Sequence, residues 1–212
     1  MFMFETLRKL KIVKLEVKSM RIDLSKYNQD WYSRGRNPLI VIIWWMVQGT
    51  IFRFSLHNMY AWRNFLLKMF GAKVANGVKV RASASFTYPW KVSIGENTWI
   101  GDHVKLYSLD EIIIGNNCVI SQESYLCTGS HDLTDPHFGL ITKPIIIKDG
   151  AWVASDVFIY PGVTVHELGV VAARSTVTKD VNYNEVHAGS PAKYVKNRFE
   201  VEVVHLKEEV MV

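Results

Sequence analysis

Two histidines that could act as a general base, His131 and His137, lie in the segment CTGSHDLTDPHFGLITKPII, residues 127–146. An imidazole titrates near neutral pH and can remove a proton from a hydroxyl group within hydrogen-bond reach. His131 lies closest to the regular part of the chain, so a rigid support can hold its ring. We therefore interpret His131 as the stronger candidate for a general base, and the alternative is an ordinary turn histidine.

The sequence holds two cysteines, Cys118 and Cys127, and no CxxC spacing. This pattern indicates no disulfide framework and suits a reducing cytoplasm. Cys127 lies four residues before His131 and is a candidate nucleophile, but a histidine that acts as a general base needs no covalent enzyme intermediate. Cys118 falls where the chain repeats a small residue, and we interpret it as part of the core.

The elements that position His131 follow from a six-residue repeat of aliphatic residues. Fifteen positions fit the repeat, and fourteen of them are Val, Ile or Leu. These positions are Val74, Val80, Phe86, Ile94, Ile100, Leu106, Ile114, Ile120, Leu126, Ile147, Val153, Ile159, Val165, Val171 and Val177. Four residues after most of them the side chain is small or slim, as at Cys118, Ser124 and Ser130.

Six residues fit a short strand and a tight turn, so three units make one coil with a triangular cross-section. The aliphatic side chains would point inward and stack between coils, because one coil cannot bury its own apolar face. Gly95, Gly101 and Gly115 each follow an aliphatic position, and we expect an unusual backbone angle there. The repeat predicts a mainly β fold, a parallel β-helix. The alternative, a β-sandwich, has strands spaced by about 8–12 residues.

One long insertion interrupts the repeat: Leu126 and Ile147 are 21 residues apart where about six are expected. A stack of coils gains nothing structurally from such a loop, and long ordered loops often carry function. We predict a functional loop over residues 132–146 within a β-helix domain of residues 73–182. Residues 1–72 are predicted to form a basic and apolar helical arm, and residues 183–212 a short C-terminal cap.

The excess positive charge lies at the N-terminus. Residues 1–36 hold nine Lys and Arg against four Asp and Glu, whereas residues 37–212 hold sixteen of each. A basic arm suits an anionic membrane surface, nucleic acid or solubility alone. The body has no basic stripe with spaced aromatic residues, which argues against a nucleic-acid partner. The first twenty residues lack an unbroken apolar core and are not predicted to be a secretory signal.

Residues 39–54, LIVIIWWMVQGTIFRF, are the one membrane-like segment of the sequence. Spanning a bilayer needs about 20 apolar residues, which is more than this segment offers. A buried helix that caps the β-helix is the favoured interpretation. The alternative is an interfacial helix, anchored by Trp44 and Trp45 and attracted by the basic arm, which would give peripheral contact at the inner face of the membrane.

Four motifs carry a resemblance to a known family: HNMYAWRNFLLKMFGAK, YPWKVSIGENTWIGD, YSLDEIIIGNNCVISQESYLCTGSHD and ITKPIIIKDGAWVASDVFIYPGVTV. Over residues 38–198 the chain resembles the hexapeptide-repeat acyltransferases, especially the acetyltransferases of colanic-acid-type exopolysaccharide synthesis. The resemblance implies a left-handed β-helix that transfers an acetyl group from acetyl-coenzyme A to a sugar hydroxyl. It also implies a homotrimer with active sites between neighbouring subunits.

The same resemblance implies site residues. His131 would be the general base, with no metal. Coenzyme A would lie along the stacked coils, contacting Trp152, Ser155, Ala173, Thr178, Lys179, Lys193 and Lys196. Related enzymes often have arginine at the last two positions, and lysine keeps the charge but loses the bidentate geometry. We expect contacts to the acceptor from Tyr107, Asp110, Tyr125 and the loop, with a sugar or oligosaccharide, free or lipid-linked, as the acceptor.

Three other functions stay open from the sequence. A γ-class carbonic anhydrase would need three histidines on one zinc, and His103, His131 and His137 are the near candidates. A non-enzymatic β-helix scaffold would need no histidine in the loop. An acetyltransferase acting on an amino sugar or on serine would use the same base as a sugar O-acetyltransferase.

Overall fold

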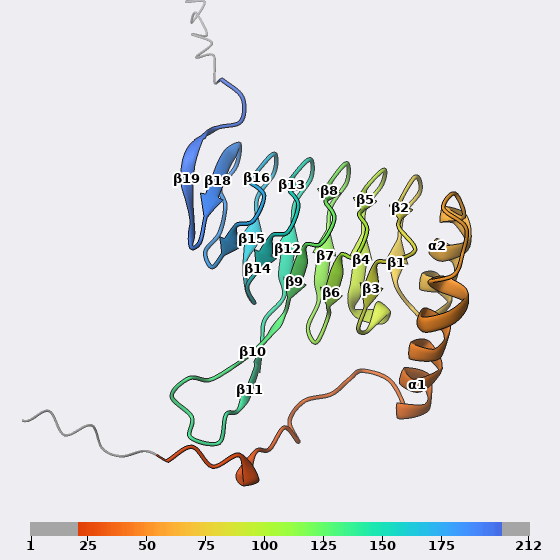
Figure 1. Cartoon of the computed structure of the whole chain (residues 1–212), viewed down its shortest axis with the longest axis vertical. Helices are drawn as coiled ribbons and strands as arrows, with labels where there is room; N and C mark the ends of the chain where they lie inside the picture. The colour runs from red at the N-terminus through yellow and green to blue at the C-terminus, as the bar shows by residue number, and fades with distance from the viewer. Residues whose placement is uncertain (1–20, 201–212) are drawn as a thin grey trace, which may run out of the picture.

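The computed structural model describes residues 21–200, whose main body is a three-sided column of short parallel strands (Figure 1). The first face holds β1 (Lys73–Val74), β4 (Val92–Ile94), β7 (Ile112–Ile114), β12 (Ile145–Ile147) and β15 (Thr164–Val165). The second face holds β2 (Lys79–Val80), β5 (Trp99–Ile100), β8 (Val119–Ile120), β13 (Trp152–Val153), β16 (Val170–Val171), β18 (Glu185–Gly189) and β19 (Ala192–Asn197). The third face holds β3 (Ser85–Phe86), β6 (Lys105–Tyr107), β9 (Tyr125–Cys127), β14 (Phe158–Ile159) and β17 (Thr176–Val177).

Neighbouring coils pair in register, so equivalent positions of the repeat stack on one another. Ile120, for example, lies between Ile100 of the preceding coil and Val153 of the following one. All fifteen predicted aliphatic positions are buried, with exposed fractions of 7% or less. The predicted parallel β-helix is therefore confirmed, and its core is one continuous stack of side chains.

The turn glycines have a different role from the one predicted. Gly95, Gly101 and Gly115 do not have the positive φ that we expected, whereas Asn97 and Asn117 in the same turns have φ of 56° and 53°. The reason for glycine is the close approach of successive coils. A Cβ atom on Gly95 would lie 2.5 Å from the backbone carbonyl carbon of Gly115, a distance that real contacts do not reach.

Helices close the N-terminal end of the column (Figure 1). They are α1 (Pro38–Val47), the π-helix η2 (Gln48–Phe52) and α2 (Tyr60–Met69). The indole N–H of Trp44 donates to the carbonyl of Phe86 at 2.8 Å, and the buried Arg63 side chain donates to the carbonyl of Val80 at 2.6 Å. Residues 39–54 therefore lie at this end of the column, but the favoured interpretation of a buried helix is wrong, because only Val41, Trp44 and Phe52 of the segment are buried. Within residues 21–200, no helix has the length and apolar character needed to cross a membrane.

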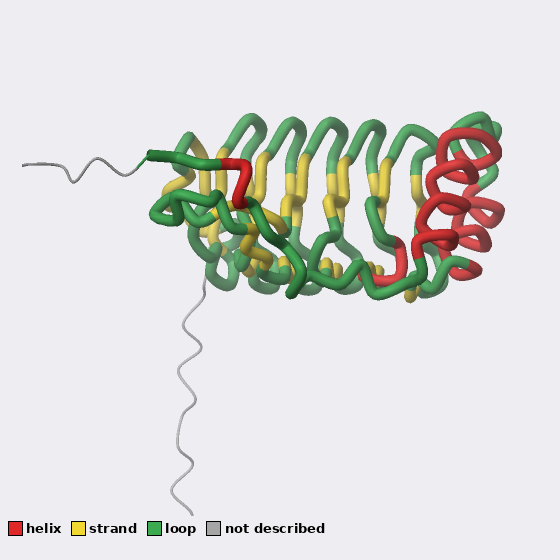
Figure 2. The backbone as a smooth tube through the Cα atoms, turned by 90° about the horizontal axis from the view of Figure 1, so that it is seen from below, coloured by secondary structure: helices red, strands yellow, loops and turns green. Residues whose placement is uncertain are grey.

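A hairpin leaves the column after β9, in the segment that interrupts the repeat. Its antiparallel strands are β10 (Gly129–His131) and β11 (Leu140–Thr142). Residues 21–37, which include the short helix η1 (Leu24–Lys26), run along the corner of the column from which this hairpin projects (Figure 2). The rest of the predicted basic arm, residues 1–20, lies outside the described residues.

The opposite end of the column is covered by the last two strands. β18 pairs in parallel with β16, and β19 returns antiparallel to β18 along the edge of the second sheet. The short helix η3 (Pro89–Lys91) lies where the first coil takes in its two extra residues. These additions leave the fifteen stacked positions of the repeat, which we call the anchors, in register. The column is therefore a rigid support for the hairpin that projects from its corner.

Candidate active site

His131 is the last residue of β10 and is held by its own hairpin. Its Nδ1 lies 2.8 Å from the carbonyl oxygen of Phe138, and its ring stacks on the Phe138 ring with centroids 4.1 Å apart. A carbonyl oxygen can only accept, so Nδ1 carries the proton of the neutral ring and Nε2 keeps a free lone pair. This tautomer is the one in which Nε2 can act as a base.

Two aspartates stiffen the turn beyond His131. Asp135 accepts the backbone N–H of Gly139 at 2.8 Å, and Asp132 accepts both the backbone N–H and the hydroxyl of Thr134 at 2.8 and 2.7 Å. The Thr134 hydroxyl and amide hold the pKa of the Asp132 carboxyl below its ordinary value. These local bonds fix the position of the Phe138 carbonyl and, through it, the imidazole of His131.

A cavity of about 200 Å³ opens beside the His131 ring. It is lined by Tyr27, Gln29, Tyr32, Arg34, Tyr88, Tyr107, Leu109, His131 and Leu140. Phenol, amide and guanidinium groups can donate hydrogen bonds to hydroxyl oxygens, and aromatic faces offer an apolar surface. The cavity therefore combines one base with the kind of lining that a polar, ring-shaped ligand requires.

The N-terminal segment supplies four of these lining residues, which sequence reasoning missed. The segment is fixed at both ends: Asp23 N–H donates to the carbonyl of Pro136 at 2.8 Å, and the indole N–H of Trp90 donates to the carbonyl of Arg34 at 2.6 Å. Between them the hydroxyl of Tyr32 donates to the carbonyl of Leu109 at 2.9 Å. The only hint in the sequence is the density of aromatic residues in YNQDWY, residues 27–32.

The three residues expected to contact the acceptor do not all meet at this cavity. Tyr107 lines it, and burial raises the pKa of the Tyr107 hydroxyl. Tyr125 lies on the third face, packed edge-on against Tyr107 with ring centroids 6.1 Å apart, and is not a lining residue. Asp110 is also not a lining residue, and its carboxylate accepts the N–H of Glu111 at 2.8 Å.

The residues expected to bind the pantetheine part of coenzyme A lie on two parts of the column. Trp152 is on the second face, 43% exposed, with its indole N–H donating to the hydroxyl of Ser121 at 3.0 Å. Ser155 and Ala173 lie on neighbouring coils, in the turns between the second and third faces. These turns are in contact, because the N–H of Arg174 donates to the carbonyl of Ser155 at 2.9 Å.

The hydroxyl and cationic side chains expected along the rest of coenzyme A lie elsewhere. Thr178 and Lys179 are exposed and follow β17, on the same corner of the column as the hairpin. Lys193 and Lys196 are exposed on β19 at the C-terminal end. Within residues 21–200, none of these three lysines forms an ion pair with a carboxylate, so their charges are free to meet phosphates.

The other nucleophilic and metal-binding candidates are placed as follows. Cys118 is fully buried in the core, and burial raises the pKa of its thiol. Cys127 is buried, with its sulfur 3.1 Å from the carbonyl of Gly129. His103 is bonded to Glu123 at 2.6 Å, on a corner away from the hairpin. Among the described residues, no three His, Cys, Asp or Glu side chains are gathered as a metal site.

Comparison with known proteins finds relatives that align with this chain over nearly their whole length. The "Putative colanic acid biosynthesis acetyltransferase WcaF" of Escherichia coli strain K12 is 48% identical over 180 residues, covering 85% of this chain and 99% of the relative. The galactoside O-acetyltransferase of the same organism is 29% identical over 137 residues, covering 63% of this chain and 68% of that one. No family model matches the chain.

Solved structures show the same architecture. The hexapeptide-repeat acetyltransferase VCA0836 of Vibrio cholerae has a TM-score of 0.70 and 27% identity, covering 76% of this chain and 92% of that one. A galactoside acetyltransferase in complex with coenzyme A has a TM-score of 0.69 and 26% identity, covering 76% of this chain and 81% of that one. These similarities confirm the expected left-handed parallel β-helix.

Proposed function

The chain belongs to the hexapeptide-repeat acetyltransferases of the colanic acid biosynthesis type, and from this premise we propose that it acetylates a sugar hydroxyl with His131 as general base. The supporting observation is the geometry of one ring. The Phe138 carbonyl holds Nδ1 of His131 at 2.8 Å, and the ring lines a cavity with Tyr27, Tyr32 and Tyr107. A fixed ring with a free lone pair beside a polar cavity is what proton abstraction from a hydroxyl requires.

The reaction needs one proton relay and no covalent enzyme intermediate. Nε2 of His131 takes the proton from the acceptor hydroxyl as its oxygen attacks the thioester carbonyl carbon. A new C–O bond forms, the C–S bond breaks, and the proton on the imidazolium passes to the leaving thiolate of coenzyme A. The Phe138 carbonyl supports the step because its bond to Nδ1 strengthens when the ring becomes positively charged.

Acetyl-coenzyme A is the proposed acetyl donor, and the solved relative that holds coenzyme A supports this choice. We place its thiol end and pantetheine between Trp152, Ser155 and Ala173, with Thr178 and Lys179 further along. Lys193 and Lys196 would meet the phosphates. The exposed lysines and the accessible backbone of stacked turns suit an elongated, polyanionic ligand.

We further propose a homotrimer of parallel columns. In one chain the proposed coenzyme residues lie on different faces of the column. This is expected if coenzyme A binds in a groove between two neighbouring columns. A closed three-fold ring of identical subunits uses heterologous interfaces, so the hairpin of one subunit can meet the face of the next. Each active site would then combine His131 of one chain with coenzyme residues of another.

The proposed acceptor is a sugar or oligosaccharide of surface polysaccharide biosynthesis, and the proposed location is the cytoplasm. The 48% identical relative, named for colanic acid biosynthesis, supports the choice of acceptor. A lipid-linked acceptor would bring the reaction to the inner face of the membrane. The tyrosines of the cavity suit a sugar ring, because their faces are apolar and their hydroxyls can bond to sugar oxygens.

Thiol release from acetyl-coenzyme A, with and without sugar acceptors, tests the proposal. His131→Ala should lower the acceptor-dependent kcat by about 10²–10⁴ because the base is lost. His137→Ala is the matched control, since His137 lies on the same hairpin and pairs loosely with Asp135 at 3.7 Å. Absence of acceptor-dependent release by the wild type, or equal losses in the two variants, would contradict the proposal.

A further inference from the structure

The helical end of the column exposes an unusual amount of apolar surface. Val41, Trp44 and Phe52 are fully buried and hold the helices to the first coil. Leu66 and Leu67 of α2 are buried as well, whereas ten other apolar side chains of this end are more than 40% exposed. With their exposed fractions they are Leu39 63%, Ile42 50%, Ile43 42%, Trp45 48%, Met46 65%, Ile51 49%, Phe54 81%, Leu56 71%, Phe65 55% and Met69 58%. We call this set the cap face.

Single exposed apolar residues are ordinary, but ten large ones on the helices and connecting segment at one end of the column mark a contact surface. A groove lined by Thr50, Ile51, Phe54, Ser55, Leu56, Met59 and Trp62 opens within the cap face. α1 has apolar residues on all sides, so packing against the column uses only one of its faces. The cap face therefore lacks a partner within the described residues.

The charged residues in the sequence segment that contains the cap face have one sign. Between Asp30 and Glu96 the sequence contains nine Lys and Arg and not one Asp or Glu. Arg63 is buried and satisfied by backbone carbonyls, whereas Arg53, Lys68 and Lys73 are exposed. Within residues 21–200, these three exposed side chains form no ion pair.

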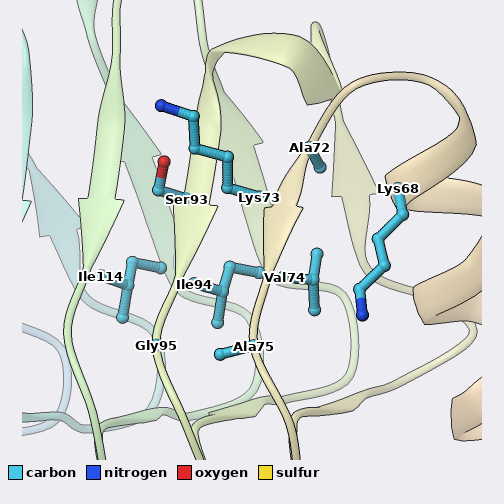
Figure 3. A pocket seen from close by; sticks show the side chains of 9 residues that line it. All are labelled: Lys68, Ala72, Lys73, Val74, Ala75, Ser93, Ile94, Gly95 and Ile114. Atoms are coloured by element: carbon cyan, nitrogen blue, oxygen red, sulfur yellow. The ribbon is translucent and has the colours of Figure 1, made fainter.

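Two of these cations flank an apolar crevice at the junction of the cap and the column. Figure 3 shows Lys68 of α2 and Lys73 of β1 beside Val74, Ile94 and Ile114 on three neighbouring strands. No carboxylate lines this crevice. Apolar surface and unpaired positive charge therefore occur together at this end of the molecule.

We propose that the cap face docks on an anionic lipid bilayer. An amphipathic helical surface lies in the membrane interface with its apolar side chains at the boundary of headgroups and acyl chains, and Lys and Arg pair with anionic headgroups. The helices are too short to span, so the contact is peripheral. Trp45 suits this position, because tryptophan favours the interface between water and lipid.

Charge argues for lipid rather than for a second copy of the chain. A symmetric contact between two cap faces would bring like charges together with no carboxylate to pair them. Anionic headgroups supply the missing negative charge. In a ring of parallel columns all the caps would face the same way, so one trimer would present three cap faces to one membrane.

The docking itself does not depend on the proposed function, but its biological purpose rests on that function. If the acceptor is lipid-linked, docking would hold the hairpin near the sugar that it modifies. Two coil spacings of about 4.8 Å and one helix diameter of about 10 Å separate the coil of β9 from the outer side of the cap. The active site would thus stand roughly 20 Å from the cap surface, within reach of a headgroup that carries sugars.

Vesicle flotation of the full chain tests the docking. The wild type should float with vesicles of phosphatidylglycerol and phosphatidylcholine, and about tenfold less with phosphatidylcholine alone. The double variant Met46→Asp with Phe54→Asp should lose about tenfold or more of its partition into the anionic vesicles. The matched control is Leu133→Asp with Val195→Asp, at sites 90% and 57% exposed but far from the cap, and it should float like the wild type.

Three results would overturn the docking. The wild type could stay in the soluble fraction with both vesicles, or the cap variant and its control could float equally. The cap variant could instead change the molar mass of the protein in lipid-free buffer, which would make the cap face an interface between copies. Thiol release with a water-soluble sugar should be the same in the cap variant as in the wild type, so failure of the docking and failure of the proposed reaction are separable.

Discussion

The interior of the column and the corner that carries His131 are built on opposite principles. Inside the column every coil makes the same contacts, so Ile120 is buried by Ile100 and Val153, as its equivalents are by theirs. At the corner each contact is made once, and the imidazole of His131 depends on a single carbonyl, that of Phe138. Repetition gives the protein a stable frame, and the departure from repetition forms the corner where we propose the chemistry.

The difference also lies in the kind of interaction. The column is held by buried aliphatic side chains and by parallel backbone bonds between coils, which are insensitive to pH. The corner is held by carboxylates, phenols and imidazole, such as Asp132, Tyr32 and His131. These bonds are directional and each is made once, so a single substitution at the corner should disturb it and leave the column intact.

The largest expected effect separates the two regions by stability. Ile120→Ala removes a fully buried anchor from the middle of the stack and should lower the free energy of unfolding by about 2–5 kcal/mol. Leu133→Ala, at a hairpin site that is 90% exposed, should change it by about 0.5 kcal/mol or less. Urea denaturation followed by circular dichroism measures both, and equal losses would mean that the two regions share one source of stability.

A smaller effect is expected where the N-terminal segment meets the column. Tyr32→Phe removes the hydrogen bond to the carbonyl of Leu109 and should cost about 0.5–1.5 kcal/mol in the same measurement. Tyr27→Phe is the control, because the hydroxyl of Tyr27 donates to the exposed Gln29 side chain and should contribute less. A larger loss in Tyr27→Phe than in Tyr32→Phe would contradict the anchoring of the segment at Leu109.

The smallest effect is a local response of the hairpin to acid. The pKa of Asp132 is lowered by bonds from the hydroxyl and amide of Thr134, so the charged carboxyl stabilises the turn. That contribution is complete above the ordinary carboxyl pKa of 3.8 and is lost as the pH falls through the lower value in the folded protein. The Thr134 amide resonance should report this titration by NMR, and Asp132→Asn should abolish it. A midpoint at or above 3.8 would contradict the assignment.

The sequence predicted the column well because burial imposes a period. Every anchor must reach the same interior, so the aliphatic positions recur at a spacing that one chain displays without any relative. His131 is the candidate base for the opposite reason, since it lies where the period breaks, and its role stays a prediction. The turn glycines show the limit of such reasoning. The sequence shows that Gly95 occupies a turn, but it does not show why glycine is needed there. Close approach of two coils and a positive φ both favour glycine.

The lining of the cavity could not be predicted in the same way. Tyr32 and Leu109 are 77 residues apart and are joined by one hydrogen bond. The six-residue repeat does not predict this contact. Tyr27 and Arg34 come from a segment whose composition suggested only a basic arm, yet they lie beside the catalytic candidate. Contacts made once between distant segments depend on tertiary geometry, and local sequence carries little trace of them.

The most direct test of the account is the protonation of the His131 ring. A long-range proton–nitrogen spectrum of protein with ¹⁵N-labelled histidine, assigned by comparison with His131→Gln, reports which nitrogen of the neutral ring carries hydrogen. We predict a proton on Nδ1 and a bare Nε2, because the Phe138 carbonyl at 2.8 Å can only accept. A neutral ring protonated on Nε2 would contradict the account, since that nitrogen could not then take a proton from the acceptor.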